Sequence, residues 1–166
     1  MIEHMLGCFS PRFSGLFLPI LLLLTPSGGF PADAPLVTAQ AHERTTLAES
    51  FSGEKLWYWQ KRLNLQDWKI SVLVVRTTDL KPKTLGNIHW DLDKKSATIR
   101  VLDPADYQLP FHEMLDDMEF TVVHELIHLQ LAPVLNSVSR NEASRRDEEH
   151  AVNHMAEALL KLDRGR

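Results

Sequence analysis

The chain of 166 residues contains a single cysteine, Cys8. A disulfide framework and a metal site built from several cysteines are therefore excluded, so a bound metal must be held by histidine, aspartate or glutamate. The sequence also has no run of basic residues, and its net charge is −4. Because a nucleic-acid groove requires a basic surface, we do not expect a nucleic-acid partner.

Long hydrophobic runs are absent except near the N-terminus. There, "FSGLFLPILLLL" follows Arg12 and is an apolar run of 12 residues. It is too short to span a bilayer comfortably, but it lies where a secretory signal has its hydrophobic region. Ala39-Gln40-Ala41 then offers a cleavage site of small residues. We predict a signal peptide over residues 1–41 and a periplasmic or secreted product; the alternative is an uncleaved N-terminal membrane anchor.

The rest of the chain suits one modest domain, which we expect to be a monomer. We predict a flexible segment over 42–52 and a folded domain over 53–163. Apolar spacing predicts a helix from Glu54, with Ser52 as a candidate N-cap. Further patterns predict three strands and then two helices, over 68–75, 85–93, 96–102, about 113–131 and about 141–161. This order indicates a small α+β domain with a three-stranded, mainly antiparallel sheet.

The stretch "TVVHELIHLQL", residues 121–131, has two histidines four positions apart and a glutamate after the first. Four residues of helix exceed a full turn by about 40°, so His124 and His128 project from one face and can bind one Zn²⁺. Glu125 would then lie beside the ion. A carboxylate there can accept a proton from a zinc-bound water and pass it to a leaving amine. The motif predicts a zinc site with Glu125 as general base.

The remainder of this helix is apolar on nearly all sides. Asp117 and Thr121 share one narrow polar sector with the two histidines. Glu119 and Gln130 lie together on the far side, and most other positions are apolar: Leu115, Met118, Phe120, Val122, Val123, Leu126, Ile127, Leu129 and Leu131. Such a helix is buried in the middle of a domain, where a polar stripe is costly unless it faces a cleft or an ion. An ordinary surface helix with two partly exposed histidines would instead be polar over most of its circumference and apolar along one stripe.

A catalytic zinc site usually has three protein ligands, and the last helix offers Glu148 and Glu149. Both flank the apolar stripe of that helix, so amphipathicity does not choose between them. Asn153 lies four residues after Glu149 and can hydrogen-bond a ligand histidine or the ligand carboxylate, whereas Val152 follows Glu148 at the same spacing. We therefore expect Glu149 to be the third ligand, with Glu148 as the alternative.

His124-Glu125-Leu126-Ile127-His128, followed by a carboxylate on the next helix, resembles the gluzincin zinc metallopeptidases. The next helix is similar to the third-ligand helix of the small ImmA/IrrE-type peptidases, at Glu149, Asn153, Met155, Ala156, Leu159 and Leu160. The resemblance implies a minimal zincin-like domain that hydrolyses a peptide or protein substrate. ImmA/IrrE-type proteins generally act in the cytoplasm on DNA-binding repressors. This chain is predicted to be exported, so the resemblance leaves the substrate open.

A peptidase also needs a hydrogen-bond donor for the tetrahedral oxyanion and a surface that holds the substrate. His154 and Tyr107 are the candidate donors, and further candidates that the sequence does not rank are His150, His89 and Arg145. The segment 85–93 is the candidate substrate-binding strand. Gly86 in this strand allows a close approach of backbone.

Together these residues predict an exported zinc metalloendopeptidase. A non-catalytic, zinc-stabilised binding module is one alternative. Glu125 separates the two, because a structural zinc site is closed and needs no base beside the ion. A cytoplasmic repressor-cleaving peptidase is the other alternative, and it requires that residues 1–41 are not a signal peptide.

Overall fold

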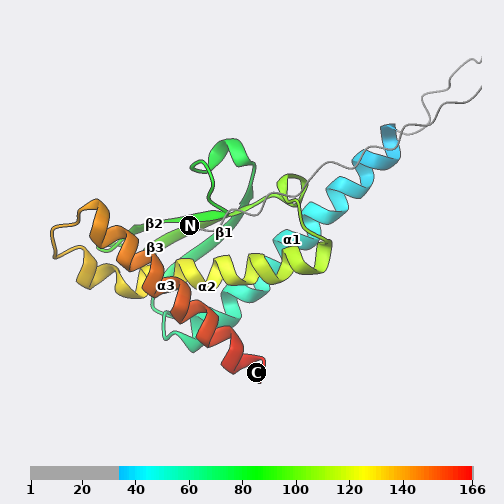
Figure 1. Cartoon of the computed structure of the whole chain (residues 1–166). Helices are drawn as coiled ribbons and strands as arrows, with labels where there is room; N and C mark the ends of the chain where they lie inside the picture. The colour runs from blue at the N-terminus through cyan, green and yellow to red at the C-terminus, as the bar shows by residue number, and fades with distance from the viewer. Residues whose placement is uncertain (1–33, 166) are drawn as a thin grey trace, which may run out of the picture. The chain divides into compact units, whose positions relative to one another are not determined.

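The structure is a computed structural model that describes residues 34–165. Most of the predicted signal peptide therefore lies outside the described residues. The elements in chain order are α1 (Ala34–Arg62), β1 (Lys69–Val75), β2 (Gly86–Asp91), β3 (Ser96–Leu102), α2 (Phe111–Leu135) and α3 (Glu142–Asp163), with 3₁₀ turns at Thr77–Asp79 and Pro104–Asp106 (Figure 1). This order confirms the predicted α+β class.

The three strands form a mixed sheet in the order β1-β3-β2. The hairpin pair β2–β3 is antiparallel as expected, but β1 and β3 are parallel. The prediction of a mainly antiparallel sheet is wrong in this respect, because the chain leaves β1, forms β2 at the far edge and returns as β3 between them. The central position suits β3, since Ala97, Ile99 and Val101 on its inner face are all buried.

Helix α1 begins well before the position that the apolar pattern indicates. It starts at Ala34, so residues 42–52, which we expected to be flexible, are helical. Ser52 lies inside the helix instead of at its N-cap, and its hydroxyl donates to the carbonyl of Glu49 at 3.1 Å. The buried face extends toward the N-terminus through Ala48 and Ser52. Small residues of this kind leave no trace in the periodicity of large apolar side chains.

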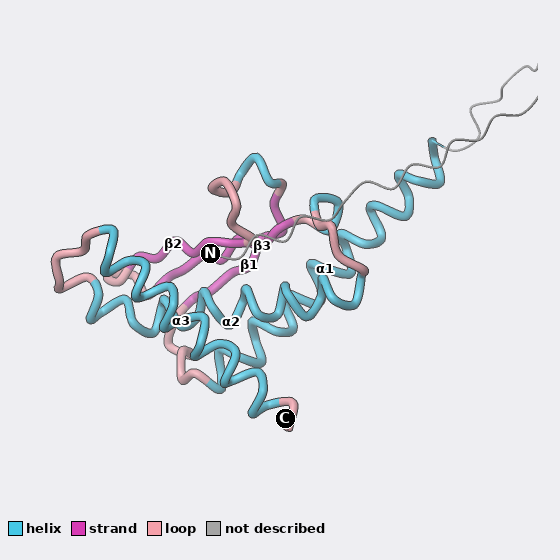
Figure 2. The backbone as a smooth tube through the Cα atoms, in the orientation of Figure 1, coloured by secondary structure: helices cyan, strands magenta, loops and turns pink. Residues whose placement is uncertain are grey.

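Helix α2 is the centre of the described domain. It packs against α1, α3 and the sheet, as the tube in Figure 2 shows. Its buried apolar residues are Met114, Met118, Val122, Val123, Leu126, Ile127, Leu129 and Ala132. The prediction of a helix that is buried on nearly all sides is therefore confirmed. None of the described helices has the length and apolar character needed to cross a membrane.

Glu119 is a buried carboxylate on α2 whose side chain is 6% exposed. It accepts a hydrogen bond from Trp59 Nε1 at 2.9 Å and forms ion pairs with Lys55 and Arg164, each at 3.0 Å. Burial by itself would raise the pKa of Glu119. The hydrogen bonds from Trp59, Lys55 and Arg164 outweigh burial and hold this pKa below its usual value. This network joins α1, α2 and the C-terminal end of α3.

Replacing Glu119 by glutamine should lower the free energy of unfolding by about 2 kcal/mol near neutral pH, because three donors lose a charged acceptor. A carboxylate with a lowered pKa gives its full stabilisation above its unfolded pKa of about 4.3, and the stabilisation is lost as pH falls through the folded pKa. Urea denaturation should therefore show a large difference near pH 7 that shrinks near about pH 3. Glu157→Gln, an exposed change on α3, is the control; equal effects of the two substitutions would contradict the account.

Candidate metal centre

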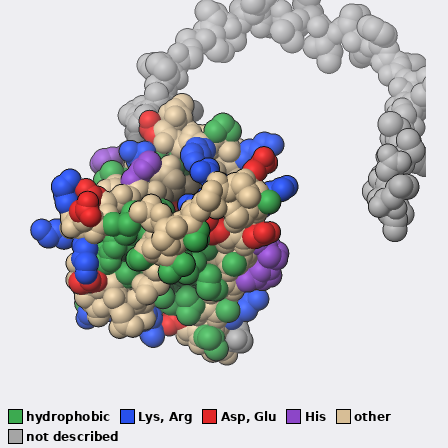
Figure 3. Space-filling model, turned by 90° about the vertical axis from the view of Figure 1, so that its left-hand side faces the viewer, with side chains coloured by type: hydrophobic (Ala, Val, Ile, Leu, Met, Phe, Trp, Pro, Cys, Tyr) green, Lys and Arg blue, Asp and Glu red, His purple; other side chains and the backbone are tan. Residues whose placement is uncertain are grey.

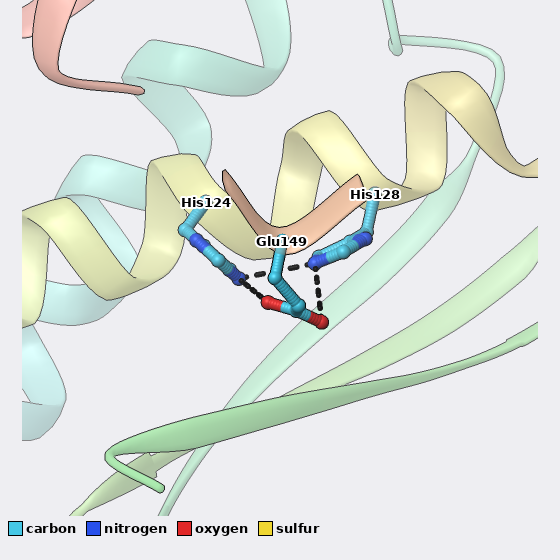
Figure 4. A group of neighbouring side chains, drawn as sticks. All are labelled: His124, His128 and Glu149. Atoms are coloured by element: carbon cyan, nitrogen blue, oxygen red, sulfur yellow. Dashed lines mark hydrogen bonds and ion pairs between the residues drawn. The ribbon is translucent and has the colours of Figure 1, made fainter. Parts of the chain in front are cut away.

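Three side chains from two helices converge on one point, as Figure 4 shows. The Nε2 atoms of His124 and His128, both on α2, are 3.0 Å apart. The carboxylate of Glu149 on α3 lies 3.3 Å from Nε2 of His124 and 3.4 Å from Nε2 of His128. Zinc bonds of about 2.0–2.1 Å at tetrahedral angles place neighbouring ligand atoms about 3.3 Å apart. The group therefore has the size and the donor atoms to hold a metal ion.

Hydrogen bonds on the far side of each imidazole direct its lone pair toward this point. Nδ1 of His124 lies 3.0 Å from Oδ1 of Asn153, and Nδ1 of His128 lies 2.9 Å from Oε1 of Glu148. Both oxygens are acceptors, so in the neutral ring each Nδ1 carries the proton and each Nε2 keeps its lone pair. Two lone pairs that face each other at this distance repel unless a cation lies between them, so the donor set fits a metal.

The structure separates the two neighbouring glutamates of α3. The side chain of Glu149 is 56% exposed and reaches the two Nε2 atoms. The side chain of Glu148 is 6% exposed and binds the opposite edge of His128 together with Arg140. Glu149 thus lies where a third ligand is expected, and Glu148 contacts a ligand instead of the point at which the ligands converge.

Glu125 lies beside the ligands and is buried. Burial, reinforced by the negative charge of Glu149, raises the pKa of Glu125 to about 8. A divalent cation held by the three ligands would oppose this shift, because a nearby positive charge favours the carboxylate. Burial and the neighbouring His128 lower the pKa of His124, against the opposing effects of Glu149 and Asn153. The neutral imidazole thus favoured is the form that binds metal.

The ligands lie in a cleft of about 540 Å³ between α2, α3, β2 and the loop that precedes β2. The strand contributes Gly86, Asn87, Ile88 and Trp90, and α2 contributes Asp117, Phe120, Thr121 and Glu125 beside the histidines. Strand β2 pairs only with β3 within the described sheet, so it is an edge strand. An edge strand has backbone groups that can pair with an extended peptide.

Gly86 lies where β2 comes closest to α2. A Cβ atom at this position would lie 2.4 Å from Cγ2 of Thr121, 2.7 Å from the carbonyl oxygen of Arg100 and 3.7 Å from Oε1 of Glu125. We expected this glycine to allow a close approach of backbone to a substrate. In the structure the close neighbour is α2, so Gly86 sets the spacing between the strand and the helix that carries the histidines.

The structure does not bring the candidate oxyanion donors to the candidate metal ligands. Neither Tyr107 nor His154 lines the cleft. Tyr107 packs against the hydrophobic core, and burial raises the pKa of its hydroxyl. His154 faces His150 on the exposed side of α3, with their Nε2 atoms 3.1 Å apart. His89 and Arg145 are exposed and do not line the cleft either.

Three basic residues line the cleft without having been identified from the sequence. Arg140 follows α2 and pairs with Glu148, while Lys81 and Lys83 precede β2 and form no ion pair with another described residue. All three lie in loops, where no periodicity indicates the direction of a side chain. The sequence offered no pattern from which they could have been found.

Comparisons with protein-family models, curated proteins and solved structures found no match to this chain. The resemblance of the histidine motif and of the last helix to zinc peptidases therefore stays a prediction, as does the zincin-like class of the fold.

Glu149→Ala should weaken zinc binding by about 100-fold or more, because one of three ligands is lost. Glu142→Ala is the control, since Glu142 is an exposed carboxylate in the first turn of the same helix. Competition with a chromophoric chelator measures both affinities. Unchanged affinity in Glu149→Ala would show that this carboxylate is not a ligand.

Gly86→Ala should lower the free energy of unfolding by about 1–3 kcal/mol, because the added methyl group overpacks the contact between β2 and α2. Gly53→Ala provides a matched control. A Cβ atom on Gly53 meets nothing within 4 Å, and the same change within a helix should stabilise by up to about 1 kcal/mol. Urea denaturation measures both values, and opposite signs are the expected result. A loss of similar size in both variants would contradict the close contact.

Proposed function

We propose that the protein is a zinc-dependent metalloendopeptidase that hydrolyses peptide bonds in an extended peptide or protein. The observation that carries this proposal is the position of Glu125, a buried carboxylate beside a three-ligand group in an open cleft. A structural zinc site is usually closed by a fourth protein ligand and needs no such carboxylate. Glu148, the nearest candidate for a fourth ligand, is occupied by His128 and Arg140.

Each residue then has a defined task. His124, His128 and Glu149 hold the ion, and the bound zinc would lower the pKa of a coordinated water and polarise the scissile carbonyl. Glu125 accepts the proton of the attacking water and delivers it to the leaving amine nitrogen. Its buried position keeps bulk water away from this proton transfer and strengthens its electrostatic interaction with charges in the site.

The edge strand supports a peptide as the substrate class. Strand β2 can bind an extended chain through its backbone, which gives affinity without demanding one side-chain sequence. The cleft offers apolar surface from Ile88, Trp90 and Phe120 beside the ligands. We further propose that the enzyme is exported, which rests on the N-terminal apolar run and the Ala39-Gln40-Ala41 cleavage site that follows it.

A non-catalytic, zinc-stabilised binding module is the second candidate. It would use the same three ligands and the same edge strand but would have no turnover. Metal content and peptide cleavage measured on the same sample separate the two functions, because both candidates bind zinc and only the peptidase consumes peptide.

Glu125→Gln should retain zinc and lose peptide cleavage by about 10²–10⁴-fold, because the general base is removed while the ligands stay. Digestion of an unbiased peptide library, followed by mass spectrometry, measures cleavage, and metal analysis verifies zinc in each sample. Glu113→Gln, an exposed change in the first turn of α2, is the control and should cleave like the wild type. Full cleavage by Glu125→Gln would refute the mechanism.

A further inference from the structure

Glu148 is held at both of its carboxylate oxygens. Oε1 accepts from Nδ1 of His128 at 2.9 Å, and Oε2 pairs with the guanidinium of Arg140. The side chain is 6% exposed, although the next residue along α3, Glu149, is mostly exposed. A buried carboxylate is costly unless it is paired and hydrogen-bonded. These two contacts are therefore what allows Glu148 to face inward.

We propose that Glu148 is a positioning residue for the metal centre and that Arg140 holds it in place. A carboxylate that accepts the Nδ1 proton fixes the tautomer and the ring orientation of His128, and it increases the basicity of the Nε2 that binds the ion. The inference rests on the proposed metal site, but it does not require that the site cleaves peptides.

The two ligand histidines are consequently not equivalent. His124 is supported by the neutral amide oxygen of Asn153 at 3.0 Å, whereas His128 is supported by the charged carboxylate of Glu148. Hydrogen bonds to an ionised acceptor are roughly twice as strong as those to a neutral one. His128 is thus held more firmly in its ligand orientation, and loss of Glu148 should weaken metal binding more than loss of the Asn153 amide.

Arg140 also connects the metal centre to the loop between α2 and α3. The apolar residues at this end of the domain contribute little anchoring, because Val134 and Val138 are 65% and 52% exposed. The loop lies on the left-hand side of the molecule in Figure 1, and Figure 3 shows that side face on. Hydrophobic side chains gather over part of this side of the molecule. The side chain of Arg140 lines the cleft and reaches Glu148, so the loop is tied to the site through this ion pair.

The test compares variants of the full chain in two measurements, zinc affinity by chelator competition and the visible absorption spectrum of the cobalt-substituted protein. Glu148→Ala should lower zinc affinity by about 10- to 100-fold and change the cobalt spectrum, because His128 is no longer oriented. Asn153→Ala should lower the affinity less. Asp147→Asn is the control, since it removes an exposed charge one residue earlier on α3 and should change neither measurement.

Two further variants guard against a merely structural effect. Glu148→Gln keeps an acceptor for Nδ1 but removes the charge, so its affinity should lie between those of the wild type and Glu148→Ala. Arg140→Gln should lower zinc affinity in the wild-type background. It should have no effect in the Glu148→Ala background, because Arg140 acts through Glu148. If Glu148→Ala fails to fold, Glu148→Gln and Arg140→Gln, each made singly in the wild-type background, carry the test.

Unchanged zinc affinity and an unchanged cobalt spectrum in the Glu148 variants would overturn the positioning role. Failure of the proposed function would give a different set of measurements. A wild-type protein that binds zinc but cleaves no peptide would refute the peptidase and leave the role of Glu148 measurable. A wild-type protein that binds neither zinc nor cobalt would refute both.

Discussion

Because helix α2 is buried on nearly all sides, the polar side chains of Glu119, His124 and His128 depend on partners from neighbouring elements. Glu119 accepts a hydrogen bond from Trp59 and forms ion pairs with Lys55 and Arg164. Asn153 and Glu148 hold the two histidines through hydrogen bonds at Nδ1. An unpaired polar group in this position would cost several kcal/mol. The packing of the domain and the geometry of the cleft therefore follow from the same requirement.

Helix α3 meets this requirement at both of its ends. Its N-terminal part presents Glu148, Glu149 and Asn153 to the histidines, and Arg164, which follows its last residue, reaches Glu119. The buried residues of α3 are apolar, namely Val152, Ala156 and Leu160. The apolar middle fixes the register of α3 on α2, and the register in turn decides which carboxylate reaches the two Nε2 atoms. A shift of one residue would bring Glu148 instead of Glu149 to the two Nε2 atoms.

The sequence predicted the central helix and the three converging side chains because helical periodicity reports direction. Asn153 was the residue that favoured Glu149 over Glu148, and it does support a ligand histidine. The early start of α1 was not predictable, since its added face consists of small residues. The parallel pairing of β1 with β3 depends on a chain path that alternation does not encode. Arg140 lies in a loop, so its contact with Glu148 emerges only from the folded chain.

The central claim is that this group of three ligands holds zinc and that the ion serves catalysis. Its most direct test measures metal content and peptide-library cleavage on one preparation of the wild-type protein, before chelation, after chelation and after zinc is restored. We expect one zinc ion per chain, with cleavage that stops when zinc is removed and returns when it is added back. A protein without zinc, or cleavage that persists in the metal-free protein, would contradict the account.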